Sequence, residues 1–398
     1  MAYGVHSGTI LVECGHRQTD ERLRLPILVS ETKGFVVVRT GRHRVRVAVA
    51  GVGNCACSLV QCIVAGRAAG DQIGVTHVQI GPYGIGDVEF VAAFDIDERK
   101  IGLDLSDAIH SDPNCTSRYI DVPNLGVPVS CGPLADGLGQ FTETVVELAE
   151  EAHTTTFTTV SEILQAAQAD VLICYMPVGA ITATSGYAEA AVEAGVAFVN
   201  CNPEAIATDP NWQRRFYERG IPVLGDDIKS QLGATTLHRT LIDLCTSRGA
   251  VIDRTYQLNV GGNTDFLNML DPQRASSKRA SKMSALKSRL NSNTQFGAGP
   301  SDYVSYLADH KVAYITVEGR SLLGMPFSIE AKLTVEDSPN SAGVAVDALR
   351  AAKLAKDRGI AGPVVEVCPF LFKRPPIPRP DSEAKEMILN FARQDATD

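Results

Sequence analysis

The sequence predicts an α/β protein in which a doubly wound parallel sheet is joined to a second α+β domain with a mixed sheet. In the first part of the chain, short β-branched runs alternate with helical stretches, which implies parallel strands joined by right-handed crossovers. Each run ends in polar or small residues, as is typical where a ligand crevice lies beyond the strand ends. From about residue 250 the runs are longer and alternate between apolar and polar residues, which indicates an antiparallel or mixed sheet.

The expected strands and helices follow one another in a regular order. The first strand is Val45–Ala50, and a glycine turn and a helix from Ser58 to Gly66 come after it. Four more buried strands are expected at Val88–Phe94, Ala169–Met176, Ala197–Asn200 and Ile221–Leu224. A helix is expected at Tyr187–Ala194, between the second and third of these strands. The strands of the second sheet are expected at Val251–Val260, Ala313–Glu318 and Ser328–Val335. A helix that returns to the first domain is expected at Ser341–Arg358.

The composition limits the class of protein. The chain has 398 residues, 44% of them hydrophobic and 6% aromatic, so we expect two or three domains whose cores depend on aliphatic residues. The net charge of −9 argues against nucleic-acid binding. The N-terminus lacks a secretory signal pattern, and no apolar stretch approaches the roughly 18 residues that span a bilayer, so we expect a cytoplasmic protein without membrane contact.

The ten cysteines are scattered among apolar and small residues. No C-x-x-C pair occurs, which indicates reduced cysteines that pack as small apolar residues. No cluster of His, Cys and carboxylate residues has the spacing of metal ligands, so no metal site is predicted.

The turn after the first strand fits the dinucleotide-binding pattern G-x-G-x-x-A. Gly51 permits a tight turn, Gly53 lets the backbone approach a pyrophosphate, and the small Ala56 lets helix and strand pack closely. The N-terminus of the following helix offers free N–H groups to the phosphates. Because a strand precedes the turn and a helix follows it, we expect a Rossmann-like domain that binds NAD, with Asn54 and Cys55 in the cofactor-binding turn.

Asp95, at the end of the second strand, is the candidate partner of the adenosine ribose. A carboxylate at this place suits NAD and repels the 2′-phosphate of NADP. Asp95 lies 42 residues after Gly53, whereas roughly 20 is usual. We therefore expect an insertion, about Gly66 to Asp87, to be looped out, and Asp97 is an alternative ribose partner.

These patterns divide the chain into four segments. Residues 1–43 are an N-terminal extension with a strand-like run at Phe35–Val38. Residues 44–245 form the NAD-binding Rossmann domain, residues 246–340 form a second α+β domain, and residues 341–398 return to the Rossmann domain.

A cluster of cations stands out in this acidic chain. Lys278 and Lys282 lie four residues apart in a stretch without acids, so on a helix they point the same way. The cluster is either a solvated helix face or part of a pocket for an anionic substrate. Lys311 interrupts a strand-like stretch, and Lys373 precedes a proline pair.

Polar turns lie between these lysines. In Asp226–Gln231, which ends a strand, Ser230 and the backbone N–H groups could hold a phosphate. Lys229 is either a further active-site lysine or a partner of Asp226 or Asp227. The turn Gly261–Asp265 would bring backbone close to a ligand. The turn Glu336–Ser341 is expected to cap a helix.

Several of these segments together resemble bacterial myo-inositol-1-phosphate synthases, over about residues 44 to 380. The segments are Gly51–Cys55, Phe94–Asp97, Gly225–Gln231, Leu258–Asn263, Asp265–Met269 and Asp337–Gly343. The resemblance implies that NAD⁺ oxidises C5 of glucose 6-phosphate, that an enolate formed at C6 attacks the C1 aldehyde, and that NADH then reduces the ketone. The product would be myo-inositol 1-phosphate, without net redox change.

The resemblance also implies roles for single residues. The catalytic residues would be Lys278, Lys282, Lys311, Lys373 and Asp265, and the cofactor would further contact Asp227 and Asp337. The substrate phosphate would be held by Ser230, Gln231, Lys282 and Lys311. The family resemblance implies a homotetramer built through the sheets of residues 246–340, and a cation that bridges phosphate and cofactor stays open.

The chain departs from the family pattern in three places, which are Gln61–Gly66, Ala180–Thr182 and Cys201–Glu204. Because these segments lie near the cofactor end of the expected crevice, a specialised relative that cyclises fructose 6-phosphate or a related sugar phosphate is an alternative. A simple NAD-dependent dehydrogenase is a second alternative, and a non-catalytic NAD-binding regulator is a third.

Overall fold

The computed structural model describes residues 43–69, 74–275, 290 and 292–393, which belong to one compact unit. The predicted strand Phe35–Val38 lies outside these residues. Seven strands form a sheet with the order β13-β8-β7-β6-β1-β4-β5, and every neighbouring pair in it is parallel. Their bounds are β1 Val45–Ala50, β4 Val88–Asp95, β5 Val129–Cys131, β6 Val171–Cys174, β7 Ala197–Asn200, β8 Pro222–Leu224 and β13 Gly362–Pro363.

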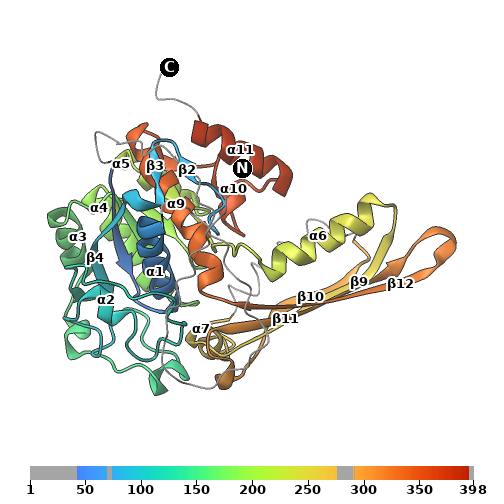
Figure 1. Ribbon diagram of the computed structural model, residues 1–398, viewed down its shortest axis with the longest axis horizontal. Helices are drawn as coiled ribbons and strands as arrows, with labels where there is room; N and C mark the ends of the chain where they lie inside the picture. The colour runs from blue at the N-terminus through green and yellow to red at the C-terminus, as the bar shows by residue number, and fades with distance from the viewer. Residues whose placement is uncertain (1–42, 70–73, 276–289, 291, 394–398) are drawn as a thin grey trace, which may run out of the picture. The chain divides into compact units, whose positions relative to one another are not determined.

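Helices cover both faces of this sheet, so it is doubly wound as predicted (Figure 1). Alternate residues of β1 serve the two layers, because side chains of a strand point to opposite faces. Val45, Val47 and Val49 pack with α1 and α9, whereas Ala48 and Ala50 pack with α3 and α4. The helices are α1 Asn54–Ala69, α2 Leu105–Ala108, α3 Phe157–Ala166, α4 Ile181–Ala194, α5 Pro210–Arg219 and α9 Pro339–Asp357.

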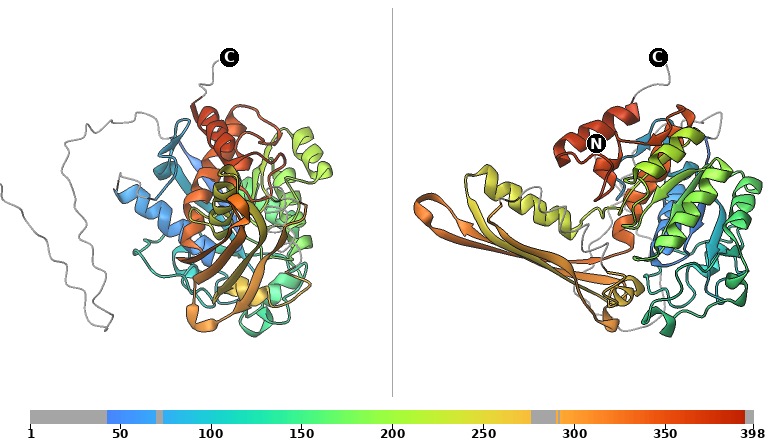
Figure 2. Two further views of the ribbon diagram at one scale, coloured as in Figure 1. Left: turned by 90° about the vertical axis from the view of Figure 1, so that its right-hand side faces the viewer. Right: turned by 180° about the vertical axis from the view of Figure 1, so that it is seen from behind.

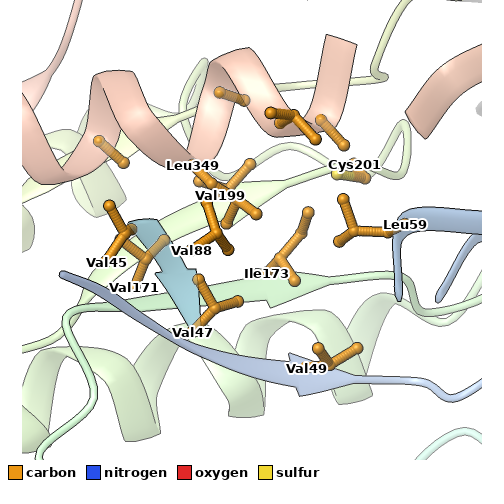
Figure 3. Close-up of a cluster of buried hydrophobic side chains, with 14 of the residues drawn as sticks. Val45, Val47, Val49, Leu59, Val88, Val171, Ile173, Val199, Cys201 and Leu349 are labelled. Atoms are coloured by element: carbon orange, nitrogen blue, oxygen red, sulfur yellow. The ribbon is translucent and has the colours of Figure 1, made fainter. Parts of the chain in front are cut away.

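The larger core cluster joins segments that lie far apart in the sequence. Figure 3 shows Leu59 of α1 and Leu349 of α9 beside the valines of β1 and Val199 of β7. Helix α9 contacts β1, β6, β7 and β8, although it follows the whole second sheet in the chain. Burial of aliphatic side chains therefore fixes the start of α9 near the ends of the parallel strands.

The second sheet is mixed and has the order β10-β9-β11-β12 (Figures 1 and 2). Strands β9 (Val251–Gly261), β11 (His310–Arg320) and β12 (Pro326–Glu336) are antiparallel neighbours, and β10 (Gln295–Tyr303) runs parallel to β9. Helix α6 (Ala234–Ser247) covers one face, where Ile242 and Cys245 pack on Ile315 and Val317. The fold class expected from the sequence is thus confirmed.

Smaller elements connect and complete these layers. The insertion between α1 and β4 contains the hairpin β2 (Gln79–Ile80) and β3 (Tyr83–Gly84) and the 3₁₀ turn Ile85–Asp87. Further 3₁₀ turns lie at Thr142–Thr144, Glu150–His153, Ser305–Leu307 and Leu322–Gly324, and the remaining helices are α7 Thr264–Asn268, α10 Cys368–Leu371 and α11 Asp381–Arg393. Among the described residues, no helix combines the length and the apolarity that a bilayer crossing requires.

The structure differs from the expected elements in several bounds. Helix α1 begins at Asn54 rather than Ser58, and α4 begins at Ile181 rather than Tyr187. Strand β10 was not expected, because Gly297, Gly299 and Pro300 interrupt its apolar pattern. Strand β10 forms through parallel pairing with β9. Tertiary contacts therefore determine this strand, because its local sequence does not favour one.

Candidate active site

One pocket lies beyond the carboxyl ends of the parallel strands, where the segments after β1, β4, β6, β7 and β8 meet. It has a volume of about 330 Å³. Helix α7 and the starts of β11 and α9 contribute to its other side. Residues predicted from the sequence that line it are Gly51, Gly53, Asn54, Cys55, Asp95, Asp227, Ser230, Asp265, Lys311, Asp337 and Lys373. The structure therefore brings the glycine turn and the charged residues of distant segments to one place.

The two glycines of the turn meet different surroundings. Gly51 has a φ of +91°, and a Cβ there would lie 2.9 Å from the carbonyl oxygen of Tyr175, so the protein itself requires a glycine. A Cβ on Gly53 would meet no atom within 4 Å. Gly53 thus leaves open space at the pocket wall, next to the N-terminus of α1.

The Asn54 side chain ties this turn to a neighbouring loop. Its Oδ1 atom accepts hydrogen bonds from the backbone N–H groups of Cys115 and Thr116, at 2.7 and 3.2 Å. The next residue, Cys55, carries a thiol whose pKa is raised to about 12 by burial. Since the thiolate is the reactive form, the Cys55 side chain is suited to packing and not to nucleophilic chemistry.

Asp95 lies directly beside the glycine turn. Its Oδ2 atom accepts from the Val52 N–H at 2.7 Å and lies 3.7 Å from the ammonium of the buried Lys100. Lys100 also donates to the Val52 carbonyl at 2.9 Å. The alternative residue, Asp97, is held by the guanidinium of Arg99 through bonds of 2.9 and 2.6 Å. Asp95 Oδ1 accepts from the N–H groups of Ile96 and Asp97, so both oxygens of each carboxylate are hydrogen-bonded. Asp95 is the more accessible of the two to a ligand, because its side chain is 12% exposed and that of Asp97 is 1% exposed.

Two of the predicted lysines form ion pairs at the pocket. The Lys311 ammonium lies 2.7 Å from Asp337, which directly precedes the N-terminal turn of α9. The Lys373 ammonium lies 2.9 Å from Asp227, which follows β8 and has a positive φ of 61°. Both pairs join segments that are far apart in the sequence, and each pairing fixes the position of its ammonium at the wall.

Lys229 does not pair with Asp226 or Asp227, which was one of the two alternatives for it. Its ammonium donates to the carbonyl of Pro369 at 2.7 Å and lies 3.3 Å from Asp381.

The Asp226 carboxylate is held by other donors and accepts from the side chain of Asn200. It also accepts from the hydroxyl of Thr208 and the N–H groups of Ile206, Ala207 and Thr208, all in the segment that leads into α5. Burial raises the pKa of Asp226, and these donors offset part of that effect.

Ser230 and Gln231 point to different places. Ser230 lines the pocket together with Gly233 and Thr236, at the N-terminus of the 14-residue helix α6. The Gln231 side chain instead donates to the carbonyl of Gly74, and the structure does not bring it to the pocket wall. Lys278 and Lys282 lie outside the described residues.

Asp309 is a buried residue for which no sequence pattern predicted a role. Its carboxylate is 1% exposed and accepts from Asn263, Ser338 and Thr116 at 2.8, 2.8 and 3.0 Å. Asn263 caps α7 just before Asp265, and Ser338 precedes the first residue of α9. Burial raises the pKa of Asp309, and the hydrogen bonds from Asn263 and Ser338 oppose that shift. One carboxylate thus connects three segments that line the pocket.

Two further pocket residues were missed, Lys100 and Arg239. Lys100 follows Asp95 by five residues and sits in a charged run that reads as a surface turn. Arg239 belongs to α6, which the sequence analysis did not identify. If α6 had been recognised as the helix that follows β8, Arg239 would have been expected near the crevice at the carboxyl ends of the parallel strands. Among the described residues, no group of three or more His, Cys, Asp or Glu side chains is arranged to hold a metal ion.

The fold places the chain among the doubly wound, Rossmann-like α/β proteins. Residues 233–338 match the family model of myo-inositol-1-phosphate synthase. The chain is 48% identical to the inositol-3-phosphate synthase of Corynebacterium glutamicum over 359 residues, which cover 87% of this chain and 98% of the relative. It is also 48% identical to the inositol-3-phosphate synthase of Mycobacterium tuberculosis over 353 residues, 87% of this chain and 95% of the relative.

Two solved structures are similar over 88% of this chain and 98% of their own length. One is the crystal structure of Ari2, with 34% identity and a TM-score of 0.73. The other is a myo-inositol-1-phosphate synthase-related protein from Thermotoga maritima, with 25% identity and a TM-score of 0.75. The chain belongs to the myo-inositol-1-phosphate synthase family.

The role of Asp309 can be measured as stability. Asp309→Ala leaves the donors of Asn263, Ser338 and Thr116 without their acceptor, so we expect the free energy of unfolding to fall by about 3 kcal/mol in a urea titration. The control is Asp302→Ala, which removes an exposed carboxylate from β10 and should change the value by less than about 0.5 kcal/mol. Equal effects of the two substitutions would contradict the role given to Asp309.

Proposed function

We propose that the protein converts glucose 6-phosphate to myo-inositol 1-phosphate, using NAD that is regenerated in each turnover. The proposal is supported by 48% identity to inositol-3-phosphate synthases over nearly the whole length of those relatives. The observation that carries it is the meeting of a glycine turn and two lysine–carboxylate pairs in one pocket. Cyclisation of a sugar phosphate needs both a dinucleotide and fixed cations beside it.

The turn after β1 fits a dinucleotide. The open space at Gly53, where a Cβ would touch nothing, is the room that the backbone needs to approach a pyrophosphate. Gly51, Gly53, Asn54 and Cys55 would hold the phosphates at the start of α1, and Asp95 would bind the adenosine ribose. When bound, NAD supplies hydride removal from a carbinol carbon and later hydride return to the same carbon.

The substrate phosphate would bind at the N-terminus of α6. Ser230, Gly233 and Thr236 line this end of the pocket, where free N–H groups and the helix dipole favour an anion. The side chains of Lys229 and Arg239 line the same pocket. Gln231 has no part in this proposal, because its side chain is bonded to Gly74.

Lys311, Lys373 and Asp265 would act on the reacting carbons. Enolisation and ring closure place negative charge on sugar oxygens, and cations fixed before the reaction stabilise such charge without reorganisation. The pairs Lys311–Asp337 and Lys373–Asp227 hold two ammonium groups in this way. Asp265 follows the cap of α7 and lines the pocket as a carboxylate that could exchange a proton with one of them.

The product identifies the reaction. The purified protein is incubated with glucose 6-phosphate and catalytic NAD⁺, and the mixture is followed by NMR. We expect myo-inositol 1-phosphate without accumulation of NADH, because oxidation and reduction cancel within each turnover. A cyclitol from fructose 6-phosphate alone would assign a different substrate. NADH formed in proportion to substrate, with no cyclised product, would contradict the proposal and indicate a simple dehydrogenase.

The cofactor assignment predicts a separation of binding from stability. Gly53→Ala adds a methyl group to the open space, so NAD affinity measured by calorimetry should fall by roughly tenfold or more while the melting temperature stays unchanged. Gly297→Ala is the matched control, because a Cβ at this position of β10 also meets nothing within 4 Å and lies outside the pocket. Unchanged NAD affinity in Gly53→Ala would argue against the turn as the pyrophosphate site.

The second sheet suggests how copies of the chain would associate. On its face opposite α6, Tyr256, Leu258 and Tyr314 are exposed, and the register pairs Leu258 with Tyr314. Exposed apolar side chains that gather on one sheet face are typical of a protein interface. We propose that this face joins copies of the chain in a homo-oligomer, with the tetramer of the family resemblance as the expected state.

A single substitution that introduces a charge at this face tests the proposed interface. Leu258 is 47% exposed in the single chain, and Leu258→Asp would bury a carboxylate between copies. Size-exclusion chromatography with light scattering should then show smaller species than the unsubstituted protein. Leu244→Asp, on the outer side of α6 and 53% exposed, is the control and should leave the oligomer intact. An unchanged mass for Leu258→Asp would exclude this face as the interface.

A further inference from the structure

The C-terminal helix places a carboxylate against two cations of the pocket. Asp381 is the first residue of α11, and one of its oxygens, Oδ1, lies 3.3 Å from Lys229 Nζ and 3.3 Å from Arg239 Nη2. Lys229 and Arg239 both line the pocket, and their side chains are only 13% and 12% exposed. Asp381 therefore brings an ammonium and a guanidinium group from different segments to a single atom.

An acid at the start of a helix has an ordinary structural explanation, which does not suffice here. Acidic residues in the first turn stabilise the helix dipole, and Glu383 already supplies one. Glu383 lies 3.4 Å from Arg379 at the surface, whereas Asp381 reaches groups that line the pocket. The contact with Lys229 and Arg239 is thus not needed for α11 to begin.

The surroundings of Lys229 make its charge sensitive to Asp381. Its ammonium faces the Pro369 carbonyl and Asp381, with Arg239 of α6 and Lys373 close enough to act on it through space. The pKa of Lys229 is lowered to about 8: burial lowers it most, Arg239 and Lys373 also lower it, and Asp381 opposes the shift. Loss of the carboxylate would therefore favour the neutral amine.

We propose that Asp381 is a positioning residue for the phosphate group of the substrate, holding Lys229 and Arg239 together at the pocket wall. One carboxylate shared by two cations leaves a net positive charge, which a phosphate monoester would neutralise. Both cations lie near the N-terminus of α6, where Ser230 and Thr236 line the pocket. This inference rests on the proposed function, because it assigns a residue to the phosphate end of the same site.

The test compares Asp381→Asn with the conservative Asp381→Glu and with Glu383→Gln, a control on the same turn of α11. Calorimetry measures the binding of glucose 6-phosphate and of inorganic phosphate to NAD-loaded protein. Asp381→Asn should weaken both by about tenfold, whereas Asp381→Glu should retain most of the affinity and Glu383→Gln all of it. NAD affinity should be the same in every variant, since Asp381 does not line the pocket at the glycine turn.

A pH series separates this role from a merely structural one. Phosphate affinity should fall as Lys229 loses its proton with rising pH, and in Asp381→Asn that fall should begin at lower pH because the pKa of Lys229 is lower. KM for glucose 6-phosphate should rise more than kcat falls. Phosphate affinity and a pH profile equal to those of the unsubstituted protein would overturn the inference. If the unsubstituted protein forms no inositol phosphate, the proposed function fails, while the inorganic phosphate measurements still decide the role of Asp381.

Discussion

The arrangement of the pocket depends on the buried carboxylate of Asp309. It lies between the cap of α7, the start of α9 and the loop at Thr116, and the same loop binds Asn54 at the start of α1. A carboxylate has lone pairs in several directions, so it can accept from donors on three segments at once. Burial makes such a group costly when it is not satisfied, and therefore ties those segments to one geometry.

This constraint matters because the two halves of the pocket come from different sheets. The glycine turn follows β1 and Asp95 ends β4 in the parallel sheet, whereas Lys311 is the second residue of β11 in the mixed sheet. Helix α9 packs on the parallel sheet, and its first turn follows Asp337, the partner of Lys311. The chain thus leaves the first sheet, builds the second and returns, and the pocket forms where the return begins.

Local patterns predicted one half of the site better than the other. The strand, the glycine turn and Asp95 follow the dinucleotide-binding pattern of Rossmann-like domains. That pattern is readable in a sequence because a bound pyrophosphate requires glycines and a helix N-terminus at fixed spacing. Asp309 and Asp381 have no such pattern, since their partners lie on other elements of the fold. Sequence proximity also did not decide the partner of Lys229, because its neighbours Asp226 and Asp227 are bound by Asn200 and Lys373.

Three lysines of the described pocket, Lys229, Lys311 and Lys373, divide into two kinds, and the proposed chemistry needs both. Lys311 and Lys373 each have a carboxylate within 2.9 Å, so their positions are set before a substrate arrives. Lys229 is held more loosely by Asp381, and burial brings its pKa to about 8. A group with a pKa near the working pH can change its charge when a phosphate dianion approaches, because the dianion stabilises the protonated form. Binding of the substrate would then complete the positive charge at this end of the pocket. Without the substrate, a fully protonated Lys229 beside Arg239 would carry a high desolvation cost, because both side chains are largely shielded from water.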